Sequence, residues 1–184
     1  MGPSGSGKSS VMMGLKNTHP DYVYPLSATT RPMRPGEKDG DIYHFLTREA
    51  FEAGIKNEAF LEYAVVHQDN YYGLIKQPVM DALEAGKTVV REVDIQGFDN
   101  IRDKVDKSQM VSIFITASNI TELTERIKAR SDMPQAELSK RITSMKKEFA
   151  RARDCDFLVE NRQGELEATI QKVAEIIAKE MGRQ

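Results

Sequence analysis

A complete phosphate-loop motif lies at the start of the chain and constrains its fold more than any other feature. Residues 2–9 read Gly-Pro-Ser-Gly-Ser-Gly-Lys-Ser and match the pattern G-x-x-x-x-G-K-[ST] at every position. The glycines let the backbone turn its N–H groups toward phosphate oxygens, and a helix that begins at Lys8 adds the positive end of its dipole. The motif therefore predicts a loop, followed directly by a helix, that binds a nucleoside triphosphate.

Two side chains of the motif are expected to reach the triphosphate directly. Lys8 would contact the β- and γ-phosphates, and the Ser9 hydroxyl would ligate Mg²⁺. Backbone groups of the same segment supply the other contacts. The residues that we expect around the triphosphate are Gly2, Pro3, Ser4, Gly5, Ser6, Gly7, Lys8, Ser9 and Ser10.

A buried strand normally precedes a phosphate loop, but here the motif begins at the second residue. We therefore expect that the first core strand is missing, either because the sequence starts at an internal methionine or because the sheet tolerates a gap or is completed by a partner. Each buried apolar side chain of such a strand would contribute about 1.5–3 kcal/mol to stability.

Composition limits the kind of protein and its partners. With 184 residues, 40% of them hydrophobic, the chain fits a single globular domain. A net charge of −2 provides no global attraction to nucleic acid or anionic membranes, so neither is expected as a partner. No apolar run reaches the roughly 18 residues of a membrane span. The only cysteine, Cys155, excludes an internal disulfide, and we expect a cytoplasmic protein.

Apolar periodicity and turn residues predict helices that alternate with strands. The expected strands are 22–26, 42–46, 59–66, 88–94, 110–116 and 157–159. The expected helices are 8–17, one that starts near Thr47, 75–85, 97–104, one from a Ser118 cap to 129, 134–153 and 165–181. This alternation is typical of a parallel α/β sheet with right-handed crossovers, in which ligands bind at the carboxyl ends of the strands.

A second group of polar residues suits a phosphate monoester. Arg31 and Arg34 lie in a loop rich in Thr, Pro and Gly, and Tyr43 follows shortly after it. Guanidinium groups bind phosphate oxygens with two N–H groups, and a tyrosine hydroxyl can donate a third hydrogen bond. Glu92 and Asp94, two residues apart at the end of a valine-rich segment, point to the same side of a strand and are expected to serve a site.

Several motifs together resemble the guanylate kinase family. The matching segments follow the family's order and nearly its spacing: 2–9, 27–37, 43–45, 60–64, 70–73, 86–88, 92–97 and 125–130. The resemblance implies an α/β P-loop kinase fold with a three-layer parallel sheet, an inserted nucleotide-monophosphate-binding subdomain and a helical lid. It also implies a Mg-dependent transfer of the ATP γ-phosphate to GMP, which gives GDP and ADP in purine metabolism.

The resemblance further implies a division of the chain and roles for named residues. The core would comprise 1–26, 81–120 and 151–184, with the nucleotide-monophosphate-binding subdomain at 27–80 and the lid at 121–150. The phosphate of GMP would be held by Arg31, Arg34, Tyr43 and Tyr72, and guanine by Ser27, Glu62 and Asp94. The catalytic side chains would be Lys8, Arg130 and Arg141, with Arg130 also binding ATP, and Glu92 would reach the Mg²⁺ of Ser9 through water. The implied partners are ATP and GMP, for a monomer or a homodimer.

The chemistry of guanine supports the role implied for Glu62. Guanine presents N1–H and N2–H₂ as adjacent donors, and one carboxylate can accept from both. Adenine has no such pair, so it would leave the carboxylate unpaired.

Three departures from the family pattern affect the expected site. Leu74 stands where the family usually has Ser or Thr, and we expect weaker guanine binding from the lost hydroxyl, by about 0.5–1.5 kcal/mol. The lid has Ser131-Asp132 instead of Gly-Thr, and the late strand ends in residues 160–162, Glu-Asn-Arg, instead of Asn-Asp.

Two other functions stay open at this point. One is a kinase for another small phosphorylated acceptor, which Leu74 favours. The other is a non-catalytic guanylate-kinase-like binding module, against which the intact Lys8 and Ser9 argue.

Overall fold

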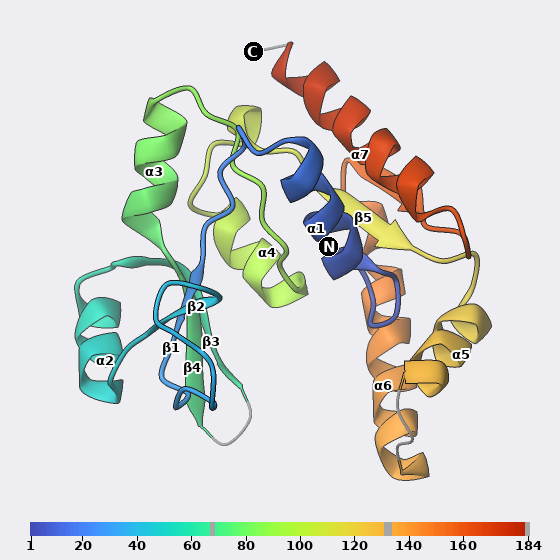
Figure 1. The fold of residues 1–184 in the computed structure, drawn as a ribbon, viewed down its shortest axis with the longest axis horizontal. Coiled ribbons are helices and arrows are strands. Elements are labelled where there is room, and N and C mark those ends of the chain that lie inside the picture. Colours follow the sequence, from blue (N-terminus) through green and yellow to red (C-terminus); the bar gives the residue numbers. More distant parts are fainter. Residues whose placement is uncertain (67–68, 131–133, 183–184) are drawn as a thin grey trace. The chain divides into compact units, whose positions relative to one another are not determined.

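The computed structural model describes residues 1–66, 69–130 and 134–182 (Figure 1). The chain forms two compact units, each built from several segments. The first comprises Met1–Pro20, Glu92–Phe98 and Asp106–Gln184, and the second comprises Asp21–Arg91 and Asp99–Val105.

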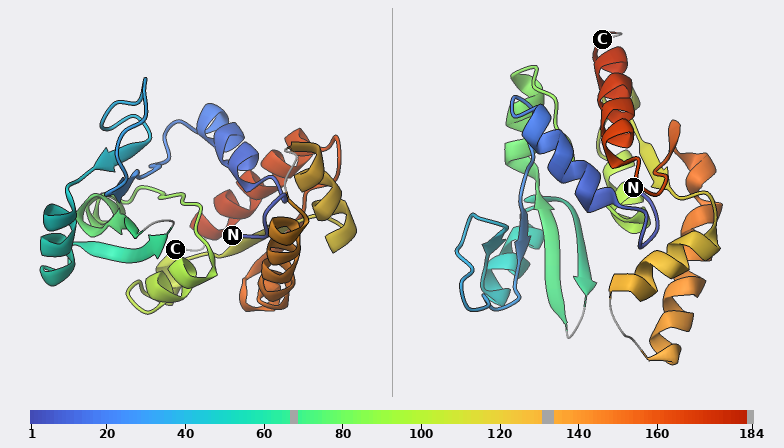
Figure 2. Two further views of the ribbon diagram at one scale, coloured as in Figure 1. Left: turned by 90° about the horizontal axis from the view of Figure 1, so that it is seen from below. Right: turned by 45° about the vertical axis from the view of Figure 1, so that its right-hand side comes forward.

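The first unit contains a parallel strand pair and most of the helices. Its elements are α1 (Lys8–Thr18), the 3₁₀ turn η1 (Lys107–Gln109), β5 (Ile113–Thr116), α5 (Ile120–Arg130), α6 (Gln135–Ala150), the 3₁₀ turn η2 (Ala152–Asp154), β6 (Phe157–Glu160) and α7 (Leu166–Met181). β5 and β6 pair in parallel along their whole length. Helices α1 and α7 lie side by side, as both views in Figure 2 show.

Met1 continues the sheet of the first unit on the other edge of β5. Its amino group donates to the Ile113 carbonyl oxygen at 2.8 Å, and its own carbonyl oxygen accepts from the Ile115 N–H at 2.8 Å. Gly2 follows so closely that a Cβ there would lie 1.9 Å from the Ile115 carbonyl oxygen. The start of the phosphate loop is thus fixed against the carboxyl end of β5.

The second unit is built on a mixed four-stranded sheet in the order β2-β1-β4-β3. Its elements are β1 (Ser27–Thr29), β2 (Tyr43–Phe45), α2 (Arg48–Lys56), β3 (Phe60–Val66), β4 (Asn70–Ile75) and α3 (Lys76–Glu84). β1 and β2 are parallel, whereas β4 is antiparallel to β1 and β3. Helix α4 (Ile95–Arg102) contributes residues to both units.

Local sequence explains several element boundaries. Thr47 caps α2, because its side-chain oxygen accepts from the Ala50 N–H at 3.1 Å. Gly86 follows α3 with φ of 67°, the left-handed conformation that commonly ends a helix. The expected cap of α5 at Ser118 is wrong: the Asn119 side chain accepts from the Glu122 N–H at 2.9 Å, and the Ser118 hydroxyl donates to Glu160 instead.

Two predicted strands do not form as regular strands. The segments 22–26 and 88–94 form one isolated parallel bridge, between Val23 and Val89, and no longer ladder within the part of the chain that the structure describes. A strand requires a continuous ladder, whereas the backbone hydrogen bonds described between these segments all lie around that bridge. The expected parallel sheet is also incomplete, because only residues 67–69 separate β3 from β4, which is too short for a parallel crossover.

Phe51 anchors the core of the second unit. Its ring is fully buried and stacks on Phe60 and Tyr71, with centroid distances of 4.2 and 5.0 Å. Gly73 in β4 leaves room for this ring, since a Cβ there would lie 2.9 Å from Phe51 Cζ. The aromatic stack therefore fixes α2 on the sheet that carries Arg31 and Tyr43.

We expect Phe51→Ala to lower the free energy of unfolding by about 3–5 kcal/mol, because it removes a buried ring and leaves a cavity. Urea unfolding followed by circular dichroism measures this change. Val65→Ala is the control, since Val65 is 55% exposed, and it should change stability far less. Equal losses in the two variants would contradict the assigned core.

Candidate nucleotide-binding sites

The phosphate loop folds back on itself before α1. Gly5 and Gly7 have φ of 83° and 87°, a conformation that side-chain-bearing residues rarely adopt. The Ser6 N–H donates to the Pro3 carbonyl oxygen at 3.2 Å, which closes the turn. Ser4 lies in the same turn, and Ser10 lies in the first turn of α1. The predicted residues 2–10 therefore form one continuous loop and helix start.

Lys8 and Ser9 lie beside an acidic group. The Lys8 ammonium donates to the Pro3 carbonyl oxygen at 3.0 Å, and the Ser9 hydroxyl donates to a Glu92 carboxylate oxygen at 3.1 Å. Burial lowers the pKa of Lys8, while the carboxylates of Glu92 and Glu148 act in the opposite direction. The structure thus places together the three side chains predicted to bind the β- and γ-phosphates and Mg²⁺.

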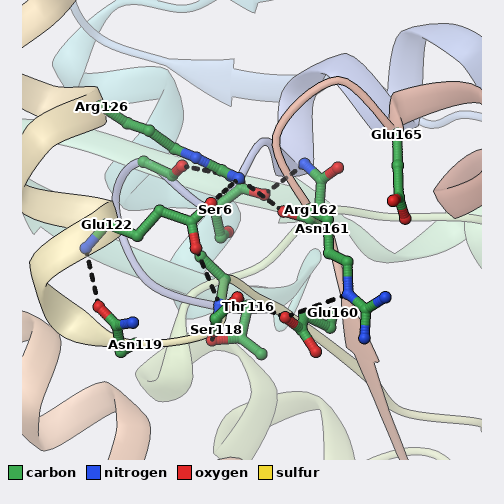
Figure 3. A network of polar contacts seen from close by, with 12 residues as sticks. Ser6, Thr116, Ser118, Asn119, Glu122, Arg126, Glu160, Asn161, Arg162 and Glu165 are labelled. Carbon is green, nitrogen blue, oxygen red and sulfur yellow. Dashed lines mark hydrogen bonds and ion pairs between the residues drawn. The ribbon is translucent and has the colours of Figure 1, made fainter.

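Behind the loop, a polar network joins it to β6 and α5, as Figure 3 shows. Asn161 donates from its side-chain Nδ2 to the Ser6 carbonyl oxygen at 2.8 Å. Arg126 donates to the Gly5 carbonyl oxygen at 3.5 Å and to the Asn161 carbonyl oxygen at 2.7 Å, and it forms an ion pair with Glu122. Residues 160–162, which depart from the family pattern, therefore include an asparagine that contacts the loop.

The other predicted groups of the first unit are only partly described. Asp94 caps α4, with its Oδ1 accepting from the Gly97 N–H at 2.7 Å. Arg141 on α6 pairs with Glu137 at 2.8 Å, and both side chains are nearly half exposed. The side chain of Arg130, at the end of α5, lies outside the described residues, as do Ser131 and Asp132.

The second unit brings together a cluster of cationic and phenolic side chains. The Arg31 guanidinium carbon lies 5.8 Å from the centre of the Tyr43 ring, and the Tyr43 and Tyr72 rings meet edge to face at 5.7 Å. Arg31 also pairs with Glu37 at 2.9 Å, and the other oxygen of Glu37 accepts from the Arg34 N–H at 2.7 Å. Arg31, Tyr43 and Tyr72 therefore form one group, with the exposed Arg34 held near them through Glu37.

Glu37 is a functional candidate that the sequence analysis missed. Its hydrogen bond from Arg31, followed by that from the Arg34 backbone, holds the pKa of the Glu37 carboxyl below its ordinary value. This carboxylate orients the arginine and neutralises part of its charge. The signal available in the sequence was an acid directly after the Arg31 to Gly36 loop.

The residues predicted to read guanine in the second unit lie on β1 and β3, the two strands that flank β4. Leu74 in β4 stands opposite Ser27 of β1 on one side and opposite Glu62 of β3 on the other. The Leu74 side chain is only 2% exposed and packs with Leu61 and Val79. At this position the chain therefore contributes to the core, and the expected effect on guanine affinity stays a prediction.

Arg91 is a second residue that the sequence analysis missed. Its guanidinium donates to the Ser27 hydroxyl oxygen and, at 3.0 Å, to the Pro25 carbonyl oxygen. A charged residue inside a segment expected to be a buried strand was the available signal. Asp94, the third residue predicted for guanine, belongs to the first unit.

Known proteins are similar to this chain in sequence and in fold. The family model described as guanylate kinase matches residues 1–180. The chain belongs to the guanylate kinase family. Guanylate kinase from Sulfurimonas denitrificans is 41% identical over 160 residues, which is 87% of this chain and 77% of that protein. The enzyme from Latilactobacillus sakei is 38% identical over 180 residues, which is 97% of this chain and 86% of that protein.

A solved structure agrees with the sequence comparisons. The crystal structure of guanylate kinase from Anaplasma phagocytophilum superimposes with a TM-score of 0.71 at 26% identity, covering 94% of this chain and 81% of that one. The predicted guanylate kinase family, the α/β P-loop kinase fold and the kinase class of enzyme are thereby confirmed. The helices of the described ranges are all too short or too polar to span a bilayer.

We expect Glu37→Gln to destabilise the protein at pH 7, with a difference from the natural sequence that shrinks as the pH falls. The pKa of the Glu37 carboxyl is lower in the folded state than its ordinary value of about 4.5. Its contribution to the free energy of unfolding is therefore present above pH 4.5 and is lost as the pH falls through the pKa of the folded state. Urea unfolding of both proteins between pH 7 and pH 3.5 measures the difference. Glu84→Gln at the end of α3 controls for loss of a charge, and a constant difference for Glu37→Gln would contradict the assigned ion pair.

Proposed function

We propose that the chain is a guanylate kinase that transfers the γ-phosphate of ATP to GMP and releases GDP and ADP. The observation that carries the proposal is that each unit holds a group of residues suited to an anion, the phosphate loop in the first and Arg31, Tyr43 and Tyr72 in the second. A triphosphate donor and a monophosphate acceptor require such a pair of sites. Membership of the guanylate kinase family supports the same pair of substrates.

In this proposal the chain has three working parts. Residues 27–80 form the subdomain that binds GMP, residues 121–150 form a lid over ATP, and the core comprises 1–26, 81–120 and 151–184. The protein acts in the cytoplasm on free nucleotides. The grouping of Ser27, Arg31, Tyr43, Glu62 and Tyr72 within the second unit supports the first of these assignments.

Lys8 is the principal cation for the transferred phosphoryl group. Its ammonium donates to the Pro3 carbonyl oxygen, and phosphate oxygens are stronger acceptors for it. Since burial lowers its pKa, an incoming triphosphate would also favour the charged form of Lys8.

The donor set at Ser9 and Glu92 fits Mg²⁺. A hydroxyl oxygen and a carboxylate oxygen lie 3.1 Å apart, and Mg²⁺ prefers oxygen ligands while retaining several waters. In the structure as described, no group of three His, Cys, Asp or Glu side chains could hold a metal alone. Ser9 would bind the ion directly and Glu92 through water, and the ion neutralises phosphate charge when it is bound.

Arg31 and the two tyrosines bind the phosphate of GMP, and Arg34 adds a second guanidinium. Glu37 keeps Arg31 oriented through one N–H group, and the rings of Tyr43 and Phe45 lie against the guanidinium. Glu62, Ser27 and Asp94 bind guanine, with the Glu62 carboxylate accepting from N1–H and N2–H₂. An oxygen of the GMP phosphate then attacks the γ-phosphorus in line, and the bond to the β-phosphate oxygen of ATP breaks.

Catalysis in this scheme rests on position and charge, since a phosphate oxygen is already a nucleophile and requires no general base. Arg130 and Arg141 of the lid would neutralise charge on the ATP phosphates. The pair between Arg141 and Glu137 is exposed, so its dissociation costs little. A closed lid would also exclude water and suppress ATP hydrolysis.

The direct test is ADP release from Mg-ATP with GMP, dGMP, AMP, UMP or no acceptor. The proposal predicts release that depends on GMP or dGMP. Release with a different phosphorylated acceptor alone would favour the alternative kinase function. Nucleotide binding without release would favour a binding module.

We expect Lys8→Met to lower kcat/KM for GMP phosphorylation by about 100-fold or more, because it removes a cation that stabilises charge in the transition state. Lys16→Met, in the last turn of the same helix, is the matched control. It should retain the natural rate. Comparable losses in both variants, or full activity of Lys8→Met, would contradict the role of Lys8.

We expect Glu62→Gln to lower kcat/KM for GMP about 10- to 100-fold, because a charged hydrogen-bond acceptor contributes about 1.5–3 kcal/mol. Activity with AMP should not fall, so selectivity for guanine decreases. Glu58→Gln, just before β3, controls for the change in charge. A parallel fall with both acceptors would show that Glu62 does not read the base.

A further inference from the structure

The carbonyl oxygens of the phosphate loop are held from outside the loop. Ser6 is completely buried, and its carbonyl oxygen accepts from Asn161 Nδ2 at 2.8 Å. The neighbouring carbonyl of Gly5 faces the Arg126 guanidinium at 3.5 Å. The Ser6 hydroxyl has no hydrogen-bond partner among the described residues. Among the described contacts, the hydrogen bond from Asn161 is therefore the shortest that joins Gly5 and Ser6 to residues outside the loop.

Asn161 is itself fixed by contacts on three sides. Its backbone N–H donates to the Thr116 carbonyl oxygen at 2.7 Å, at the end of β5. Its backbone carbonyl accepts from Arg126 at 2.7 Å. Its side-chain oxygen accepts at 3.1 Å from the Thr169 hydroxyl, which shares its one hydrogen with the Glu165 carbonyl oxygen at 3.0 Å. Asn161 and Thr169 are 6% and 3% exposed. The amide thus has one orientation, with its NH₂ toward Ser6, because a carbonyl oxygen can only accept.

We infer that Asn161 is a positioning residue for the phosphate loop and sets the affinity of the enzyme for the phosphates of ATP and ADP. A loop that binds phosphate must direct its N–H groups inward, and its carbonyl oxygens would repel the anion if they turned the same way. Asn161 holds the Ser6 carbonyl outward. The ligand then binds a loop that is already in its bound shape, which reduces the ordering cost of binding.

Gly7 shows how closely the asparagine fits the loop. A Cβ at Gly7 would lie 2.3 Å from Asn161 Nδ2, a distance that real Cβ atoms do not adopt. The second glycine of the motif is therefore required both for its φ of 87° and for this approach. Because Asn161 contacts two consecutive residues of the loop, a small change at its amide should alter the loop more than the overall fold.

The test compares Asn161→Asp with Asn119→Asp in the full chain, with the dissociation constant for Mg-ADP measured by calorimetry. Asn161→Asp keeps the shape but sets a carboxylate oxygen against the Ser6 carbonyl oxygen. We expect its dissociation constant at pH 8 to rise about tenfold or more. In the described contacts the Asn119 side chain acts only as an acceptor, for the Glu122 N–H, so Asn119→Asp should bind ADP normally.

The pH dependence separates positioning from a general structural effect. A protonated carboxyl can donate to the Ser6 carbonyl, so the defect of Asn161→Asp should diminish between pH 8 and pH 5.5. A defect that stays constant over this range, or unchanged ADP affinity at pH 8, would overturn the inference. Equal weakening of GMP binding would also overturn it, since the described contacts of Asn161 include the phosphate loop but none of the residues predicted to bind GMP.

A milder variant keeps the inference testable if Asn161→Asp does not fold. Thr169→Val removes the hydroxyl that orients the amide, and we expect ADP affinity to fall about threefold at a nearly natural melting temperature. Unchanged affinity would overturn the inference. The inference rests on the proposed binding of ATP by the loop, but ADP affinity is independent of the acceptor. ADP binding without GMP phosphorylation would therefore reject the proposed function and leave the role of Asn161 measurable.

Discussion

The direction of the carbonyl groups in the phosphate loop is the constraint on which the rest of the first unit depends. Every peptide that presents its N–H to a phosphate must find a partner for its carbonyl oxygen elsewhere. Here the partners are Asn161, at the end of β6, and Arg126, on α5. The strand pair of β5 and β6 and the helix α5 are thus needed to shape the loop. Close contact of Gly2 with β5 fixes the other end of the same loop.

Each of the two candidate anion sites contains a carboxylate close to its cationic group. Glu92 accepts from Ser9 and acts on Lys8 in the first unit, and Glu37 pairs with Arg31 in the second. Burying an isolated cation costs free energy of folding. These carboxylates reduce that cost and leave some N–H donors of the cation open to other acceptors. A phosphate or Mg²⁺ can then add to groups that are already in place. This arrangement is a direct consequence of placing charged side chains in partly buried sites.

Local signals in the sequence predicted the local features of the fold. The phosphate loop, the Thr47 cap of α2 and the amphipathic helices depend on residues close in sequence. The segments 22–26 and 88–94 were wrong as strands, because a ladder depends on distant partners that apolar periodicity does not report. Arg91 escaped notice for the same reason: its partner, Ser27, is far away in the chain. Asn161 was noted only as part of a departure from the family pattern, and its contact with Ser6 could be found only in three dimensions.

The most direct measurement of the central claim follows the transferred phosphoryl group itself. The chain would be incubated with Mg²⁺, GMP and ATP labelled with ¹⁸O in the γ-phosphate, and the products analysed by mass spectrometry and ³¹P NMR. The account predicts that the label appears in the β-phosphate of GDP, with little in inorganic phosphate. Label confined to inorganic phosphate, or retained in ATP while the folded protein binds both nucleotides, would contradict it.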